Sequence, residues 1–172
     1  SPTHSYDVLD YQIFMDIYDC FIDPYPYSFN ATYTITFKVV EELSTIKLNA
    51  INSSLNINSV GLSGISYTHT YDTLEIQLDA TYSTDDIVQV SIEYNHNNVF
   101  DNHFYVDNGF VFTDNPSEGA RYWFPCWDKP SDKATTDFTL RVPTNVILGS
   151  NGILANEWEE GGAKFLNWIH NY

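Results

Sequence analysis

The chain has 172 residues, the length of one ordinary domain, and 43% of them are hydrophobic, which excludes a disordered chain. Seven basic against 23 acidic residues give a net charge of −16, which excludes nucleic acid as a partner. No apolar run approaches the roughly 20 residues of a membrane-spanning helix. Aromatic residues make up 16% of the chain and favour sheets, because flat rings pack well on a pleated surface.

Alternation of apolar and polar residues predicts strands along most of the chain. Residues 8–18 alternate in this way, and residues 29–40 repeat the pattern with threonines on one side. Further strands are predicted at residues 45–48, 55–60, 74–78, 87–94, 109–113, 135–142 and 164–170. No helical period lasts longer than a turn or two. The sequence therefore predicts a single all-β, mostly antiparallel, sandwich-like domain over residues 1–172.

One long segment, residues 113–133, interrupts this pattern and contains three prolines and two tryptophans. A loop of that length in a compact domain is usually either functional or a wrongly assigned element. We expect it to be ordered, because each proline lowers the entropy lost on folding. Trp123, Phe124 and Trp127 should be largely buried, and Arg121 should pair with a carboxylate, first of all Asp128.

The residues that could carry chemistry indicate no catalytic site within this chain. The sequence contains no H-E-x-x-H, no G-x-S-x-G and no phosphate-binding glycine loop. His96 and His103 lie near Asp101 and Asp107, which is compatible with a metal cluster, but a polar surface loop is the favoured interpretation. No catalytic or metal-binding residue is therefore predicted here.

Two cysteines and two glycosylation triplets bear on the cellular compartment. Cys20 and Cys126 are too few for a disulfide framework and lack C-x-x-C spacing, so both are expected to be free thiols. The triplets that begin at Asn30 and Asn52 are compatible with secretion. They favour a secreted or periplasmic location over a cytoplasmic one.

The aromatic residues also permit a ligand-binding interpretation. Tyr25, Tyr27, Tyr122, Trp123 and Trp127 could stack on sugar rings, as on a carbohydrate-binding sandwich. Packing in the core is the favoured alternative, because several of these rings flank prolines that would hold a loop against a sheet.

Residues 120–130, A-R-Y-W-F-P-C-W-D-K-P, followed by D-K-A-T at 132–135 and by Phe138, resemble a signature of the aminopeptidase N family of zinc metallopeptidases, the gluzincin aminopeptidases. That family carries A-R-x-x-F-P-C-x-D-x-P-x-x-K-A-x-F near the end of its N-terminal domain. The opening residues 6–11 resemble its Y-D-V-x-x-Y first strand, residues 34–37 resemble its next strand, and residues 151–152 resemble its S-N-G turn. The likeness spans the whole chain in the right order.

The resemblance implies a saddle-shaped N-terminal β domain that packs over a thermolysin-like catalytic domain and is inactive alone. In the parent enzyme, zinc and a general-base glutamate would remove single residues from peptide N-termini, and both belong to the later domain. No cofactor is expected in this fragment. The implied partners are the chain's own downstream catalytic domain and a peptide substrate. Family members usually continue past residues 164–172 into another strand, so the last strand is expected to be truncated.

One substrate-binding role of the family falls on this chain. Its T-Q-x-E or T-Q-x-Q stretch, whose last residue helps to hold the substrate's free amine, aligns without gaps on Thr113, Asp114, Asn115 and Pro116. Proline supplies no side-chain acceptor, so Asp114 and Asn115 are the nearest substitutes. The domain would then wall the active-site cleft and help to position the amine. A free-standing carbohydrate-binding sandwich, or a scaffold that has lost its catalytic partner, are the alternatives.

Overall fold

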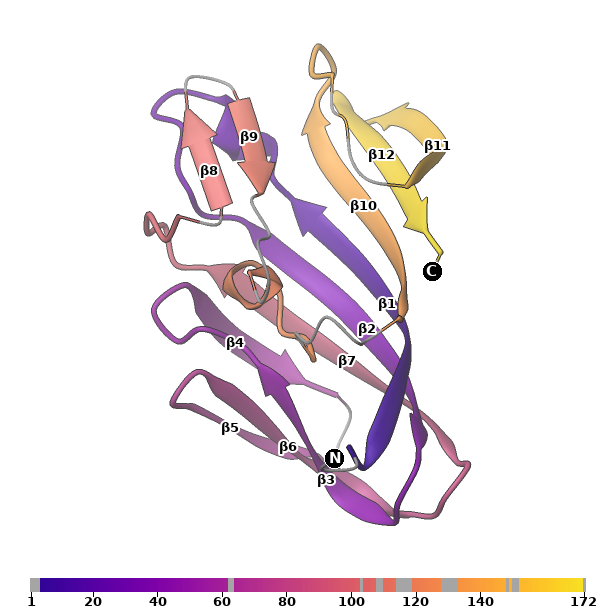
Figure 1. Ribbon diagram of the computed structural model, residues 1–172. Helices are drawn as coiled ribbons and strands as arrows, with labels where there is room; N and C mark the ends of the chain where they lie inside the picture. The colour runs from indigo at the N-terminus through magenta and orange to yellow at the C-terminus, as the bar shows by residue number, and fades with distance from the viewer. Residues whose placement is uncertain are drawn as a thin grey trace.

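The computed structural model describes residues 4–61, 64–102, 104–107, 110–113, 119–127, 133–147, 149 and 152–171 (Figure 1). Its largest element is a seven-stranded sheet. In spatial order the strands are β11 (Ile153–Glu160), β12 (Ala163–His170), β10 (Thr135–Pro143), β1 (Tyr6–Asp16), β2 (Asn30–Val39), β7 (Ile87–His96) and β4 (Leu55–Val60). Neighbouring strands in this sheet run antiparallel except β1 and β10, which are parallel.

Two smaller sheets complete the fold. A three-stranded antiparallel sheet contains β3 (Leu43–Asn49), β6 (Thr73–Tyr82) and β5 (Ser66–Thr70), in that order. A hairpin of β8 (Phe104–Asp107) and β9 (Phe110–Thr113) forms the third sheet. Within the described ranges the helices are two short 3₁₀ turns, η1 (Tyr18–Phe21) and η2 (Ala120–Tyr122). The three-stranded sheet lies at one end of the molecule and the hairpin at the other (Figure 1).

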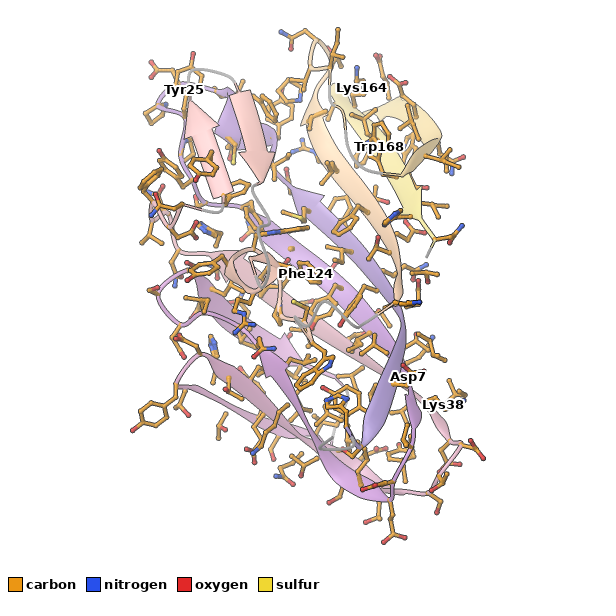
Figure 2. All side chains as sticks on the ribbon, viewed as in Figure 1. Asp7, Tyr25, Lys38, Phe124, Lys164 and Trp168 are labelled. Atoms are coloured by element: carbon orange, nitrogen blue, oxygen red, sulfur yellow. The ribbon has the colours of Figure 1, made fainter. Side chains whose placement is uncertain are left out.

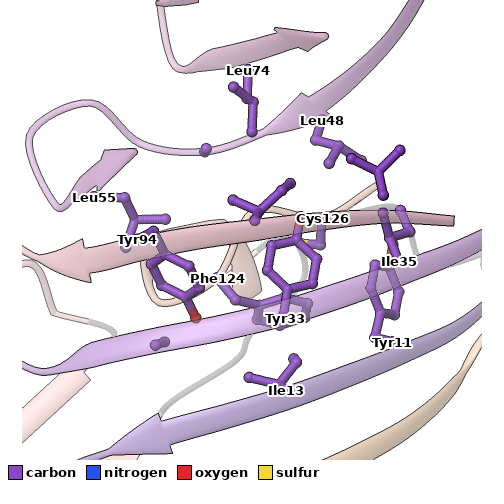
Figure 3. Packing of buried hydrophobic residues seen from close by; sticks show 14 of the residues in the cluster. Tyr11, Ile13, Tyr33, Ile35, Leu48, Leu55, Leu74, Tyr94, Phe124 and Cys126 are labelled. Atoms are coloured by element: carbon purple, nitrogen blue, oxygen red, sulfur yellow. The ribbon is translucent and has the colours of Figure 1, made fainter. Parts of the chain in front are cut away.

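One face of the large sheet carries the core. Along β2 the residues alternate strictly, with Tyr33, Ile35 and Phe37 buried and the threonines between them on the opposite face. Leu48 of β3 and Leu74 of β6 face these side chains from the smaller sheet (Figure 3). Burying each such side chain contributes about 1.5–3 kcal/mol, so the two sheets are held together by one continuous apolar cluster.

The predicted all-β, mostly antiparallel architecture is confirmed, and every predicted strand is present with ends shifted by a few residues. Three strands were not predicted: β5, β8 and β11. The strand β11 is exposed along its whole length, and β5 alternates only between exposed and half-buried polar or aromatic residues, so neither has the apolar–polar period that marks a strand with one buried face. The third, β8, has four residues, too few to establish a period.

Candidate functional site

The segment that carries the family signature begins with a tight turn after β9. We call residues 119–127 the aromatic segment. The backbone N–H groups of Trp123 and Phe124 both donate to the carbonyl of Ala120 at 3.0 Å, and that of Tyr122 donates to Gly119 at 3.3 Å. This single 3₁₀ turn, η2, reverses the chain and directs the residues that follow it into the core.

The aromatic segment is bonded to the small sheet through its backbone. Asn49, the last residue of β3, and Cys126 exchange two hydrogen bonds, at 2.7 and 3.0 Å. Five residues earlier in the segment, the carbonyl of Arg121 accepts from the N–H of Ile51 at 3.1 Å. Backbone groups buried in this region are thereby satisfied without a regular strand.

The same segment is bonded to the large sheet through two tyrosine hydroxyls. Tyr94 of β7 donates to the carbonyl of Trp123 at 2.8 Å, in a fully buried position. The hydroxyl of Tyr11 on β1 accepts from the N–H of Trp127 at 3.0 Å. The aromatic segment therefore joins the two sheets and is fixed to both.

Ring packing fills the space between these hydrogen bonds. Phe124 makes edge contacts with Tyr11 and Phe138, at centroid distances of 5.5 and 6.1 Å. The ring centroids of Trp123 and Phe138 are 5.4 Å apart. Figure 2 shows Phe124 near the middle of the molecule, and Figure 3 shows it among the tyrosines of the large sheet. The predicted burial of Trp123 and Phe124 is confirmed. The order predicted for the whole of residues 113–133 stays a prediction, because residues 114–118 and 128–132 lie outside the described residues.

Trp127 is less buried than Trp123 and Phe124, although all three were predicted to be largely buried. It is half-buried, and it stacks on His4 at a centroid distance of 3.7 Å with 23° between the planes. The predicted substrate residues Asp114 and Asn115 lie outside the described residues, as does Asp128, the predicted partner of Arg121. Their roles therefore stay predictions.

Two tyrosines and one cysteine in the core are held neutral. Burial raises the pKa of Tyr33 and of Tyr94 well above the ordinary value of a phenol. Burial, with a smaller contribution from the charges of Asp19 and Asp16, raises the pKa of the Cys20 thiol to about 12. Both cysteines are free and buried. None of these groups has the pKa near neutrality that a general acid or base needs.

A buried polar cluster lies at the base of the β8–β9 hairpin. The polar surface loop favoured from the sequence is wrong for His96 and Asp101, because their side chains are 0% and 5% exposed. One carboxylate oxygen of Asp101 accepts from the hydroxyl of Ser54 at 2.7 Å and from Nε2 of His96 at 2.9 Å, while the other accepts from the N–H of Phe104 at 3.0 Å. Ser54 and His96 bond the same oxygen rather than each other, so this is not a nucleophile–base pair. It ties Ser54, which immediately precedes β4, and Phe104, the first residue of β8, to His96 at the end of β7.

Metal binding at this cluster has no support from the geometry. In the parts of the chain that the structure describes, no group of three or more His, Cys, Asp or Glu side chains could hold a metal ion. His96 is fully buried against Phe29 and Phe104, with one nitrogen bonded to Asp101. His103 lies outside the described residues.

The aromatic residues first considered for sugar binding belong to the core. Trp123 is buried, while Tyr25, Tyr27 and Trp127 pack against the apolar cluster as half-buried side chains. Core packing, the favoured alternative, is confirmed for these four residues.

Residues 3–169 match the Peptidase M1 N-terminal domain family, which is nearly the whole chain. The chain belongs to this family. Aminopeptidase M1 of Arabidopsis thaliana is 43% identical over 49 residues, and aminopeptidase M1-D of Oryza sativa subsp. japonica is 42% identical over 52 residues. These matches cover 28% and 30% of the chain, but 6% of each relative. The chain thus corresponds to a small part of the curated relatives that it matches.

Solved structures of M1 peptidases share the fold. An M1 zinc metallopeptidase from Deinococcus radiodurans, bound to a Tyr-Ser-Ala substrate, superposes with a TM-score of 0.82 at 20% identity. The superposition covers 96% of this chain and 39% of that one. A second structure, a two-domain M1 zinc metallopeptidase bound to L-tryptophan, gives the same TM-score and covers 40% of that chain. Among the described residues, no helix has the length and apolar character to cross a bilayer.

Proposed function

We propose that the chain is the non-catalytic N-terminal domain of a zinc aminopeptidase that removes residues from peptide N-termini. The observation that carries this proposal is the aromatic segment, which bears the family signature and is hydrogen-bonded to both sheets. Its other end connects through residues 114–118 to β9. We place the wall of the active-site cleft at these five residues, which join β9 to the aromatic segment in the sequence and lie outside the described residues.

The specific role that we assign to this wall is to help position the substrate's amine. A protonated N-terminus is a small cation with three hydrogen-bond donors, and a carboxylate accepts such bonds in a charge-assisted form. Asp114 supplies the carboxylate, and Asn115 supplies a neutral acceptor beside it. Pro116 occupies the family's usual acceptor position and supplies neither.

The described residues do not fit a zinc site, so no step of the reaction is assigned to a metal in this chain. In the parent enzyme the metal would polarise the peptide carbonyl and activate water. Its ligands are expected in a downstream catalytic domain. The reading frame tests this directly: an H-E-x-x-H motif roughly a hundred or more residues beyond Tyr172 is expected, and its absence would favour the scaffold alternative.

The amine-binding role is tested by kinetics of the full-length enzyme with Asp114→Ala. Loss of a charge-assisted hydrogen bond made equally in the ground and transition states should raise KM for free-amine peptides about tenfold and leave kcat unchanged. Glu159→Ala on β11 is the matched control, because it removes a carboxylate from an exposed strand remote in sequence. An unchanged KM in Asp114→Ala would mean that the domain acts as a scaffold and does not help to bind the amine.

A further inference from the structure

A broad trough of about 740 Å³ lies on the face of the large sheet opposite the core. Its floor is a single row of side chains that crosses all seven strands, each residue paired in register with the next. From one edge to the other the row consists of Ser59, Glu93, Thr32, Phe14, Thr139, Asn167 and Asn156. At the usual strand spacing this row is roughly 29 Å long.

Both edge strands have an irregularity that brings a polar residue onto the trough. The register of β4 shifts between Ile57 and Ser59, and that of β11 shifts between Leu154 and Asn156. A bulge of this kind re-aims the side chains that follow it. As a result Ser59 and Asn156 line the trough at its two ends.

Three stacked aromatic rings line the trough at the β11 side. Trp158 of β11 lies parallel to Phe165 of β12, with centroids 5.2 Å apart and 3° between the planes. Phe165 in turn stacks on Phe14 of β1 at 6.3 Å. Trp158 is 41% exposed on this face of the sheet. Because Phe165 lies between the other two rings, the outer face of Trp158 is the ring face left open to a ligand, and an exposed indole face is a typical stacking surface.

The remaining lining groups are hydroxyls, carboxamides and carboxylates, and no Lys, Arg or His is among the described residues that line the trough. Hydroxyl and carboxamide groups both donate and accept hydrogen bonds, as does a ligand rich in hydroxyl groups. The carboxylates of Glu93 and Glu160 can accept from such hydroxyls, and they repel an anionic chain. A third carboxylate, Asp137, accepts from Asn167 Nδ2 at 2.5 Å. Among the described residues, no three His, Cys, Asp or Glu side chains come together as metal ligands.

We propose that this trough binds a neutral linear polysaccharide, with a sugar ring stacked on the outer face of Trp158 and the hydroxyl groups of the chain bonded along the polar row. The site lies on the face of the large sheet opposite the aromatic segment and does not depend on peptidase activity. It adds a carbohydrate-binding function to a domain whose family is defined by peptide hydrolysis.

The test is affinity gel electrophoresis of the full-length protein in gels that contain hydroxyethyl cellulose, arabinoxylan, galactomannan or laminarin. At least one of these should retard the protein, and Trp158→Ala should weaken that binding about tenfold, whereas Trp158→Phe should keep most of it. Asn156→Ala should weaken binding as well. The matched control is Tyr71→Ala, which removes an aromatic ring that is 98% exposed at the β5–β6 turn, away from the lining residues, and should change nothing.

Thermal unfolding of each variant shows whether its fold is intact, which is expected because β11 is an exposed edge strand. Three results would overturn the proposal. The first is no retardation by any of the four polysaccharides. The second is wild-type binding by Trp158→Ala, or a loss in Tyr71→Ala as large as in Trp158→Ala. The third is binding of oligolysine in the absence of any polysaccharide binding, which would make the trough a site for cationic peptides.

Discussion

Asn49 and Cys126 exchange two backbone hydrogen bonds although 77 positions separate them in the sequence. Asn49 ends β3, which is an edge strand of the small sheet. The aromatic segment therefore pairs with part of an otherwise open edge, and it covers backbone groups that would be available to another chain. Because the segment is also bonded to β1 and β7, removing it would expose both sheets at once.

The hydrogen bond between Tyr94 and Trp123 should contribute measurably to stability. Tyr94→Phe removes the hydroxyl and leaves the buried carbonyl of Trp123 without that donor, so the free energy of unfolding should fall by about 1–2 kcal/mol. Urea denaturation measures this. A loss below about 0.5 kcal/mol, within the range of surface substitutions, would show that the carbonyl finds another donor.

Tyr33→Phe is the matched control, because Tyr33 is equally buried but its hydroxyl has no hydrogen-bond partner among the described residues. Its removal relieves an unsatisfied buried group and should leave stability unchanged or raise it by about 1 kcal/mol. A loss as large as that of Tyr94→Phe would mean that ring packing rather than hydrogen bonding decides both results.

Stability should fall steeply in alkali, because the folded state holds the protons of Tyr33, Tyr94 and Cys20 more tightly than the unfolded state does. Their pKa values are raised by burial, to about 12 for Cys20. The stability that each group contributes is complete below its unfolded pKa, about 8.5 for Cys and 10 for Tyr, and is lost as the pH rises towards the folded pKa. Within that pH range, each group lowers the free energy of unfolding by about 1.4 kcal/mol per pH unit.

Urea denaturation as a function of pH measures this loss, and Tyr33→Phe should make the decline above about pH 10 shallower, since one raised phenol is then absent. An identical slope in wild type and Tyr33→Phe would show that Tyr33 ionises in the folded chain as it does in the unfolded one.

The two thiols should be unreactive in the native protein and fully reactive once it unfolds. Cys20 and Cys126 are buried, and the raised pKa of Cys20 keeps it in the thiol form at neutral pH. A thiol reagent should therefore label neither residue in buffer and two per chain in guanidinium without reductant. Zero labels in guanidinium would indicate a disulfide, and rapid native labelling would indicate that the region around one cysteine opens readily.

Much of this fold could be predicted because burial on one face leaves a period of two in the sequence. The strands β1, β2 and β7 show it, since each alternates between the core and the trough. By contrast, β11 is exposed on both faces, so its residues show no such alternation. The sequence therefore did not predict the strand that carries Trp158, the most exposed ring of the trough. Parallel pairing of β1 with β10 brings together residues about 125 positions apart, which local patterns do not encode.

The candidate sites also differ in how far the sequence could predict them. The aromatic segment could be recognised because its residues are adjacent in sequence and match a family signature. The trough could not, because its row takes one residue from each of seven strands and exists only once the register is fixed. In the cluster of Ser54, His96 and Asp101, the sequence placed His96 near Asp101, five positions away, but not Ser54, which is 47 positions from Asp101.

Asp101→Ala should be among the most destabilising substitutions of a polar residue in this chain. The side chain of Asp101 is 5% exposed and accepts from Ser54, His96 and the backbone of Phe104. Nδ1 of His96 has no hydrogen-bond partner among the described residues, so the tautomer that leaves no donor unsatisfied carries its hydrogen on Nε2 and donates it to Asp101. Without the carboxylate, this Nε2–H group and the hydroxyl of Ser54 stay in the core without their acceptor. The free energy of unfolding should therefore fall by about 3–5 kcal/mol.

Asp101→Asn should cost less than Asp101→Ala, because the carboxamide keeps one oxygen for the N–H of Phe104 and fills the same volume. Asp7→Ala is the control, since it removes an exposed carboxylate from β1 and should change stability by less than about 0.5 kcal/mol. Urea denaturation gives the free energies, and hydrogen exchange at the Phe104 amide reports whether the base of the β8–β9 hairpin opens before the rest of the domain. Since this hairpin leads directly to residues 114–118, an opening confined to it should also raise KM in the full-length enzyme. Wild-type exchange at Phe104 in Asp101→Ala would show that the hairpin is held by other contacts.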